Sequence, residues 1–451
     1  MKRPSLIGPL ILILIGLVFL ARNLRPDWIS LHALATYWPF LLIAWGLLRL
    51  IEVVYWRITS QPLPRSAISG GEWVLVVLIC ILGSSLAFFS SRASLWPAVV
   101  IGERSIDEVF GVAFDYPIQP VKNAAKVSAI VVENLRGDIR ITGSDVDEVT
   151  IGGVRTVRAL SKSDADAVAA GQAFSSAIEG DRMVIRTAQA EGKADRVRIT
   201  TTLELTVPRR DTIEATARAG DFEVSGMESA VNLIDNDGNV EVRNLGGALK
   251  VDLRRSSLVR GQNLRGKVEI LGRGRDVELD NVTGPVTING YFSGNIQVRN
   301  LSQALFFQSG ITELRAGGVP GRLELSLGDV TGVNLVGPIV FTARSKDVDL
   351  RQVKGEVNIS VERGDIRFQP EAAPSEKIQL STRSGDIEVV LPAGAGFELD
   401  AATQRGQVEN AFGEPVQVIT EGQGAAMKTP AGRGPKIIVR TERGRITIRK
   451  G

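Results

Sequence analysis

The densest set of side chains able to bind a ligand is a basic cluster in the middle of the chain. Positions 254 to 275 carry seven basic residues and a single acid, Glu269. Arginine makes bidentate contacts with phosphate and carboxylate groups, so the cluster is a candidate surface for anionic lipids or glycans. The alternative, which we favour, is a solvated edge whose like charges prevent edge-to-edge aggregation. The seven residues are Arg254, Arg255, Arg260, Arg265, Lys267, Arg273 and Arg275.

Residues typical of catalysis and of metal sites are scarce. The chain has one cysteine, Cys80, and one histidine, His32, which lies between two apolar segments. This count excludes an intramolecular disulfide and a Cys/His zinc site. We therefore predict no catalytic residue, no cofactor and no metal, and no enzymatic activity.

Two short motifs resemble known ligand sites. Arg136-Gly137-Asp138 and Arg363-Gly364-Asp365 spell the integrin tripeptide, but each arises where arginine precedes a repeated Gly-Asp pair. Calcium-binding β-rolls need an Asp in every turn. The residue after the repeated glycine varies here, so we expect no carboxylate ladder and no calcium site; it is Asp221, Asn239, Lys267, Pro285 or Arg322.

The N-terminal part of the chain is apolar enough to span a membrane. Apolar segments cover about 6–22, 37–56 and 73–90, close to the roughly 17–25 residues that a spanning helix needs. We predict a transmembrane region over 1–92 and a linker over 93–125. Basic residues near the segments favour a cytoplasmic N-terminus and an extracytoplasmic C-terminal domain. The inner set is Lys2, Arg3, Arg49, Arg57 and Arg65, and the outer set is Arg22, Arg25 and Arg92.

The rest of the chain repeats a short unit in which glycine precedes two aliphatic residues separated by a polar one. Because the aliphatic residues alternate, both lie on one face of a strand. Units begin nine residues apart at Gly328, Gly337, Lys346, Gly355 and Gly364. Clear examples are Gly137-Asp138-Ile139-Arg140-Ile141, Gly238-Asn239-Val240-Glu241-Val242 and Gly385-Asp386-Ile387-Glu388-Val389.

This interval predicts an all-β solenoid over 126–451. Nine residues are too few for a strand and a crossover helix, so a βαβ arrangement is excluded. Stacking the units would bury their apolar faces, with two units forming a coil of about eighteen residues. A β-sandwich is the competing architecture, and the constant interval argues against it. The Ala-rich segment 161–178 predicts a helical insertion, with Ser163 and Asp166 spaced as a capping box.

The outer domain resembles the bacterial putative-adhesin family of unknown function, whose members are Gly-Asp-Ile/Val-rich β-solenoids. The resemblance runs from about Lys126 to the C-terminus. It rests on Val131-Val132-Glu133-Asn134, Leu203-Glu204-Leu205-Thr206-Val207-Pro208, Ser384-Gly385-Asp386-Ile387, Val390-Leu391-Pro392, Phe397-Glu398-Leu399-Asp400-Ala401 and Arg443-Gly444-Arg445-Ile446-Thr447-Ile448.

The first fifty residues resemble the LiaI/LiaF-like transmembrane region of bacterial envelope proteins. The matching residues are Gly8-Pro9-Leu10, Gly16-Leu17, Arg22-Asn23, Trp38-Pro39-Phe40-Leu41-Leu42-Ile43 and Gly46-Leu47-Leu48. This resemblance implies envelope-stress sensing as the setting.

We therefore expect a non-enzymatic integral protein of the bacterial cytoplasmic membrane, whose extracytoplasmic solenoid is a binding or adhesin-like surface. Its expected partners are the membrane, envelope proteins, anionic lipids or glycans. Nucleic acid is not expected, because the domain should lie outside the cytoplasm. A self-assembling envelope scaffold is the alternative, and an enzyme acting on polysaccharides is a distant one.

Overall fold

The computed structural model describes residues 111–124, 126–187, 198–255, 258–421, 424–430 and 434–451, with single residues at 43, 46, 47, 50, 77, 80, 100, 101, 104 and 105. The chain divides into two compact units. Unit 1 comprises 1–116, 155–173 and 188–200, and unit 2 comprises 117–154, 174–187 and 201–451. The three predicted spans lie outside the described residues, apart from the single positions. Among the described residues, no helix is long and apolar enough to cross a membrane.

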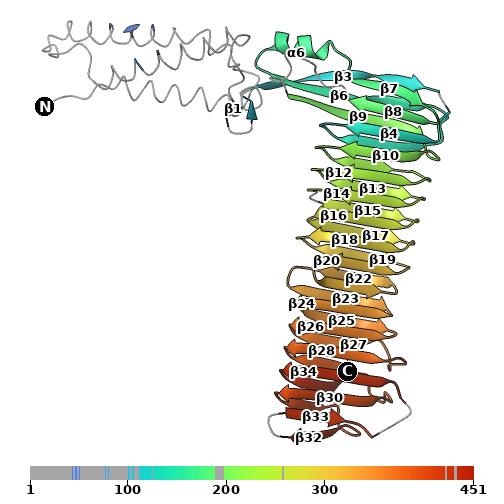
Figure 1. The fold of residues 1–451 in the computed structure, drawn as a ribbon, viewed down its shortest axis with the longest axis vertical. Helices are drawn as coiled ribbons and strands as arrows, with labels where there is room; N and C mark the ends of the chain where they lie inside the picture. The colour runs from blue at the N-terminus through green and yellow to red at the C-terminus, as the bar shows by residue number, and fades with distance from the viewer. Residues whose placement is uncertain are drawn as a thin grey trace, which may run out of the picture. The chain divides into compact units, whose positions relative to one another are not determined.

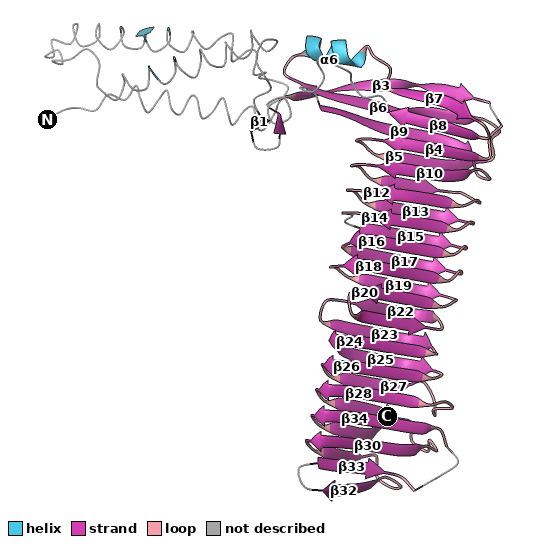
Figure 2. Ribbon diagram, viewed as in Figure 1, coloured by secondary structure: helices cyan, strands magenta, loops and turns pink. Residues whose placement is uncertain are grey.

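Two large β-sheets make up most of the described chain (Figures 1 and 2). Following the pairings, sheet 1 contains β7 (Phe174–Glu179), β8 (Arg182–Thr187), β4 (Ala129–Asn134), β10 (Thr212–Ala217), β12 (Val231–Asp235), β14 (Leu249–Leu253), β16 (Val268–Gly274), β18 (Val286–Phe292), β20 (Leu305–Ser309), β21 (Thr312–Ala316), β24 (Ile339–Ser345), β26 (Val357–Arg363), β28 (Ile378–Ser384), β34 (Lys436–Arg443), β30 (Glu398–Arg405), β33 (Gly424–Lys428) and β32 (Gln417–Glu421).

Sheet 2 contains β3 (Val112–Asn123), β6 (Val149–Ala159), β9 (Arg198–Pro208), β5 (Ile139–Ser144), β11 (Phe222–Ser225), β13 (Val240–Leu245), β15 (Leu258–Leu264), β17 (Asp276–Val282), β19 (Ile296–Leu301), β22 (Val319–Leu325), β23 (Asp329–Val336), β25 (Asp347–Lys354), β27 (Ile366–Pro370), β29 (Ile387–Leu391), β35 (Ile446–Lys450) and β31 (Val408–Ala411). Strands β1 (Val100–Ile101) and β2 (Arg104–Ser105) form a separate antiparallel pair.

Unit 2 is a β-solenoid in which each coil gives one strand to each sheet. Ile213 lies opposite Val231, and Val231 lies opposite Leu249, a step of eighteen residues each time. Val231 and Leu233 are buried between the sheets, whereas Asn232 points outward. The predicted eighteen-residue coil is therefore confirmed, and the stack of parallel coils excludes the β-sandwich.

One coil in the middle of the solenoid runs backwards, which the constant interval did not predict. Strand β20 turns at Gly310 into the antiparallel strand β21, and β22 then turns at Gly328 into β23. Strands β21 and β22 thus cross the two sheets in the reverse direction before the parallel coils resume at β23 and β25. An alternating apolar pattern is the same in both directions, so it carries no signal of this reversal.

A second departure from sequence order lies near the C-terminus. Strand β34 pairs in parallel with β28 on one side and β30 on the other, although β30 precedes it by about thirty residues in the chain. Strand β35 lies in the same way between β29 and β31. The coil formed by β34 and β35 is therefore inserted between two earlier coils, and Figure 1 shows β34 between β28 and β30.

The solenoid has two edges. We call edge 1 the side where strands of sheet 1 pass into sheet 2, and edge 2 the side where sheet 2 passes back into sheet 1. Near edge 2, six strands of sheet 2 each contain a left-handed residue, and the aliphatic residue after it points into the core. Asn263 donates to Asn244 at 2.9 Å, and Asn281 donates to Asn263 at 2.7 Å. The left-handed residues are Asn244, Asn263, Asn281, Asn300, Asn334 and Gln352.

The repeated glycines allow close approach between neighbouring coils as well as turns. Gly364 has a φ of +135°, and a Cβ atom there would collide with the carbonyl oxygen of Lys346 in the preceding coil. Gly385 stands in the same relation to Gly364. The glycine column therefore permits the backbone contact that starts each strand.

Unit 1 holds the helical insertion, which is shorter than predicted. Helix α6 spans Lys162–Ala169, and residues 174 to 178, predicted as helix, belong to strand β7. The N-cap is Ser161, whose hydroxyl accepts from the Asp164 amide at 3.2 Å, so the expected capping pair of Ser163 and Asp166 is wrong. Gly171 follows the helix, and antiparallel pairing with β8 fixes the next residues as a strand. Strand β3 likewise occupies residues 112–123 of the predicted linker 93–125.

Helix α6 is held by a small polar network within unit 1. The Tyr116 hydroxyl donates to Asp166 Oδ1 at 2.7 Å, and Lys162 Nζ lies 2.8 Å from the same atom. Hydrogen bonds from Lys162 and Tyr116 hold the pKa of Asp166 below its usual value. Desolvation and the hydrogen bond to Asp166 raise the pKa of Tyr116 to about 12.

We expect substitution Gly364→Ala to destabilise the solenoid by about 3 kcal/mol, because alanine must adopt a strained φ and its Cβ strikes a carbonyl. Gly328→Ala is the matched control, since nothing lies within 4 Å of its Cβ position. Thermal unfolding of the detergent-solubilised chain, followed by β-sheet circular dichroism, measures both. Equal melting temperatures for the two variants would contradict the proposed role of the glycine column.

We expect Tyr116→Phe to raise the pKa of Asp166 towards its ordinary value. Because the folded pKa of Asp166 is depressed, its contribution to helix docking is present above the unfolded pKa, about 3.9, and is lost as pH falls through the folded pKa. As the pH is lowered, the variant should therefore lose the contribution of Asp166 to helix docking at a higher pH than the natural chain does. Carboxyl NMR titration measures the shift, and Thr156→Val, which removes a hydrogen bond to Asp115, should leave it unchanged.

Candidate functional site

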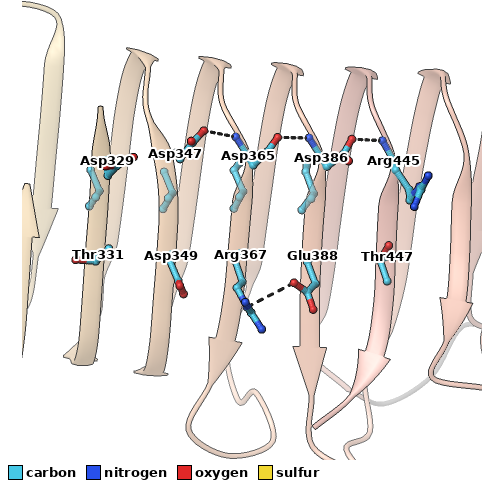
Figure 3. Close-up of a pocket in the computed structure, with 14 residues that line it drawn as sticks. Asp329, Thr331, Asp347, Asp349, Asp365, Arg367, Asp386, Glu388, Arg445 and Thr447 are labelled. Atoms are coloured by element: carbon cyan, nitrogen blue, oxygen red, sulfur yellow. Dashed lines mark hydrogen bonds and ion pairs between the residues drawn. The ribbon is translucent and has the colours of Figure 1, made fainter. Parts of the chain in front are cut away.

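An aspartate ladder crosses the outer face of sheet 2 beside edge 1 (Figure 3). Asp347 Oδ1 accepts from the Asp365 amide at 2.8 Å, and Asp365 Oδ1 accepts from the Asp386 amide at 2.7 Å. Asp386 Oδ1 then accepts from the Arg445 amide at 2.7 Å. Asp329 continues the row on the other side (Figure 3). The carboxylates of Asp347, Asp365 and Asp386 therefore each join one coil to the next.

This ladder corrects the expectation that the carboxylates would not stack. Asp329, Asp347 and Asp365 recur every eighteen residues, and the last step to Asp386 takes twenty-one. The variable positions noted in the sequence lie mainly in earlier coils. Within the described part of the chain, no group of three or more acidic, histidine or cysteine side chains is arranged to hold a metal ion.

A second row of side chains runs parallel to the ladder and completes a groove of about 510 Å³. This row contains both positive and negative side chains, and Arg367 Nε lies 3.5 Å from a carboxylate oxygen of Glu388. Glu388 also pairs with Arg449 at 2.5 Å. Asp349 pairs with Arg351, and this hydrogen-bonded carboxylate raises the pKa of Arg351. The second row is Thr331, Asp349, Arg367, Glu388 and Thr447.

The groove has the chemistry of a recognition surface. Its side chains repeat at the coil spacing of about 4.8 Å, which suits an extended ligand that contacts several coils. Carboxylates dominate the row nearest edge 1 and favour cationic groups there, while Thr331 and Thr447 offer neutral hydroxyls. Asp365, the third residue of an integrin-like tripeptide, has the same hydrogen bonds as its ladder neighbours.

A larger groove of about 730 Å³ lies on the opposite sheet. Small outward side chains form its floor, since Thr342, Ser360 and Ser381 face one another on successive strands. Two ion pairs line its sides, one between Arg344 and Glu362 and one between Arg383 and Glu442, each with a nitrogen–oxygen distance of 3.7 Å.

The seven residues of the predicted basic cluster are distributed over three places. Arg260 is on the outer face of sheet 2, where an ion pair with Glu278 at 2.9 Å neutralises its charge. Arg265 and Lys267 are at edge 2, and Lys267 pairs with Glu269. Four lie together at edge 1, in the turns after β14 and at the end of β16; they are Arg254, Arg255, Arg273 and Arg275.

Neither groove was predicted from the sequence, nor was an apolar patch at edge 1. The patch consists of Tyr291, Ile311 and Leu327, which are 68%, 64% and 74% exposed. Two of the three follow or precede a glycine turn, where an aliphatic residue is unusual, and this was the available signal. The ladder could have been found by counting Asp residues at intervals of eighteen.

Comparison with known proteins identifies the fold just described. Residues 120–449 match the Toastrack DUF4097 family model, which covers most of the chain. The chain belongs to the Toastrack family. Residues 7–102 match the LiaF transmembrane domain, so the Toastrack solenoid follows a membrane anchor. Both resemblances seen in the sequence are thereby confirmed. No curated protein matches this Toastrack chain.

Three solved structures are similar to 74% of the chain. A putative cell adhesion protein from Clostridium sporogenes is 11% identical, with all of its own chain covered and a TM-score of 0.19. A putative adhesin from Bacteroides fragilis is 12% identical, with 97% of its own chain covered and a TM-score of 0.14. A putative lipid binding protein from Parabacteroides distasonis is 13% identical, with 96% of its own chain covered and a TM-score of 0.20. At these identities and TM-scores they identify no ligand for the Toastrack solenoid.

We expect Asp365→Ala to release the Asp386 amide, because that amide loses its acceptor. The loss should be about 1 kcal/mol, at the low end for a charge-assisted hydrogen bond because the site is exposed. Asp365→Asn is the matched control, since its amide oxygen can still accept. Hydrogen exchange of the Asp386 amide should accelerate several-fold in the alanine variant, and faster exchange in both variants alike would rule out a role for the acceptor.

Proposed function

We propose that this protein is a non-enzymatic, membrane-anchored envelope protein whose Toastrack solenoid acts as a binding or adhesin-like surface outside the cytoplasm. Envelope-stress sensing is the setting that its LiaF-type anchor favours. The observation that carries the proposal is the groove of the aspartate ladder, where outward side chains repeat in register over five coils. Such a surface suits an extended envelope component better than a small substrate.

The arrangement of charges supports binding over catalysis. A general acid and base need unequal environments that separate their pKa values. The carboxylates of Asp347, Asp365 and Asp386 instead have equivalent environments, each accepting one backbone amide. Their common role is to connect coils while presenting the remaining oxygen outward.

A self-assembling scaffold is the second candidate, and one strand favours it. Strand β32 is the last strand of sheet 1, and its Val418 and Ile419 are 49% and 41% exposed. An uncovered edge with apolar side chains can pair with a second copy. Against this, the loop after β31 packs Phe412 edge-on against Phe397 at 5.3 Å between ring centroids, and both of these apolar rings are buried.

Site-specific photocrosslinking in intact cells tests the proposal. A photoreactive residue at Thr331, in the groove, should capture one defined envelope component. The same residue at Lys250, an exposed position of β14 away from both grooves, should not. Identical products at the two positions, or none at Thr331, would refute the binding surface. The same residue at Val418, in β32, should capture a second copy of the chain if the scaffold is correct.

A further inference from the structure

We infer that edge 1 carries a second surface, which docks on an anionic phospholipid bilayer. This surface combines the apolar patch of Tyr291, Ile311 and Leu327 with the four arginines of edge 1. It rests on the proposed function only in that the solenoid faces an envelope membrane, and it is separate from the groove of the aspartate ladder.

The apolar part of this surface results from the reversed coil. Ile311 is at the tip of the hairpin between β20 and β21, and Leu327 is at the tip of the hairpin between β22 and β23. Both reversals occur at edge 1, so the two tips come together in the middle of the stack. They line, with Tyr291, one hollow of about 300 Å³ whose floor includes Phe292 and Phe307.

Hydrogen bonds from neighbouring coils fix the two hairpin tips. Lys346 Nζ donates to the carbonyl of Leu327 at 3.0 Å and to that of Ser326, and burial lowers the pKa of Lys346. The Phe292 amide donates to the hydroxyl of Ser309 at 3.1 Å, next to the Gly310 turn. Exposed apolar side chains on two fixed turns are costly in water, which indicates that they are covered in use.

Basic side chains continue the patch along the edge. Arg273 lies directly opposite Tyr291 in the register of β16 and β18, and Arg254 follows one coil further. Among the described residues, no acid is within ion-pair distance of Arg254, Arg255 or Arg273, and all three are exposed. Arg275 is 4.0 Å from Asp276. On the other side of the patch, Arg344 is neutralised by its ion pair with Glu362 at 3.7 Å.

An anionic bilayer is the occupant that this combination fits best. Phosphate groups are matched by arginine, tyrosine favours the interface between head groups and acyl chains, and aliphatic tips can enter the acyl region. The matched LiaF transmembrane domain keeps a bilayer near the solenoid at all times, which raises its effective concentration. A peptide partner would need deeper pockets for anchor residues than this shallow hollow offers.

Lipid-borne quenching in the full chain tests this inference. The chain, with Cys80→Ser, carries a fluorophore at Ile311→Cys and is reconstituted into bilayers with a lipid quencher. We expect at least two-fold quenching in phosphatidylglycerol bilayers, little in phosphatidylcholine bilayers, and a decrease as salt is added. The same fluorophore at Asn358→Cys, on the outer face of sheet 1, should not be quenched in either.

Charge variants decide which arginines act. Arg254→Gln, Arg255→Gln and Arg273→Gln together should abolish the quenching with unchanged circular dichroism. Arg265→Gln with Lys267→Gln, at edge 2, should leave it intact. Equal quenching in both lipids, absence of quenching in phosphatidylglycerol, or equal loss in the two charge variants would overturn the inference. Crosslinking at Thr331 tests the outer face of sheet 2, whereas quenching tests edge 1. A negative quenching result therefore leaves the crosslinking result at Thr331 unaffected.

Discussion

Backbone pairing between successive coils is the constraint on which the rest of the structure depends. A single coil has one apolar face per strand and cannot bury it alone, so each coil needs a neighbour above and below. Parallel pairing in exact register, such as Ile339 opposite Val357 opposite Ile378, brings the aliphatic residues into continuous inner columns. The insertion of one residue within a strand would move the following side chains of that strand to the other face.

The same register forces like residues to stack on the outside, where stacking is not always favourable. Aspartates one above another would repel, and the chain uses each as an acceptor for the next backbone amide, as between Asp365 and Asp386. Asparagines at edge 2 pass a hydrogen bond from Asn281 to Asn263 and on to Asn244. Sequence repetition therefore produces ladders, and the aspartates and asparagines that recur in them have side chains that can hydrogen-bond to the neighbouring coil.

Local pattern predicted the coil but not its exceptions. The nine-residue interval gave the eighteen-residue step seen between Val231 and Leu249, because side-chain alternation and turn spacing are local properties. The reversed coil was hidden, since the glycines at 310 and 328 look like those of ordinary turns. The ladder was obscured because the segment before β28 lengthens one coil by three residues. The apolar patch depends on two hairpins meeting, which is a property of the fold and not of either segment.

The inserted coil of β34 and β35 has a consequence for biosynthesis. Translation delivers β30 to β33 before β34, so a nascent solenoid presents β30 while its eventual neighbour is still inside the ribosome. Strand β30 has the same alternation as β34, and β28 offers it a parallel partner at once. A stack one coil too short is therefore a ready kinetic trap, which the later segment must open by displacing strands. Export in an unfolded state, followed by folding of the complete segment, would avoid it.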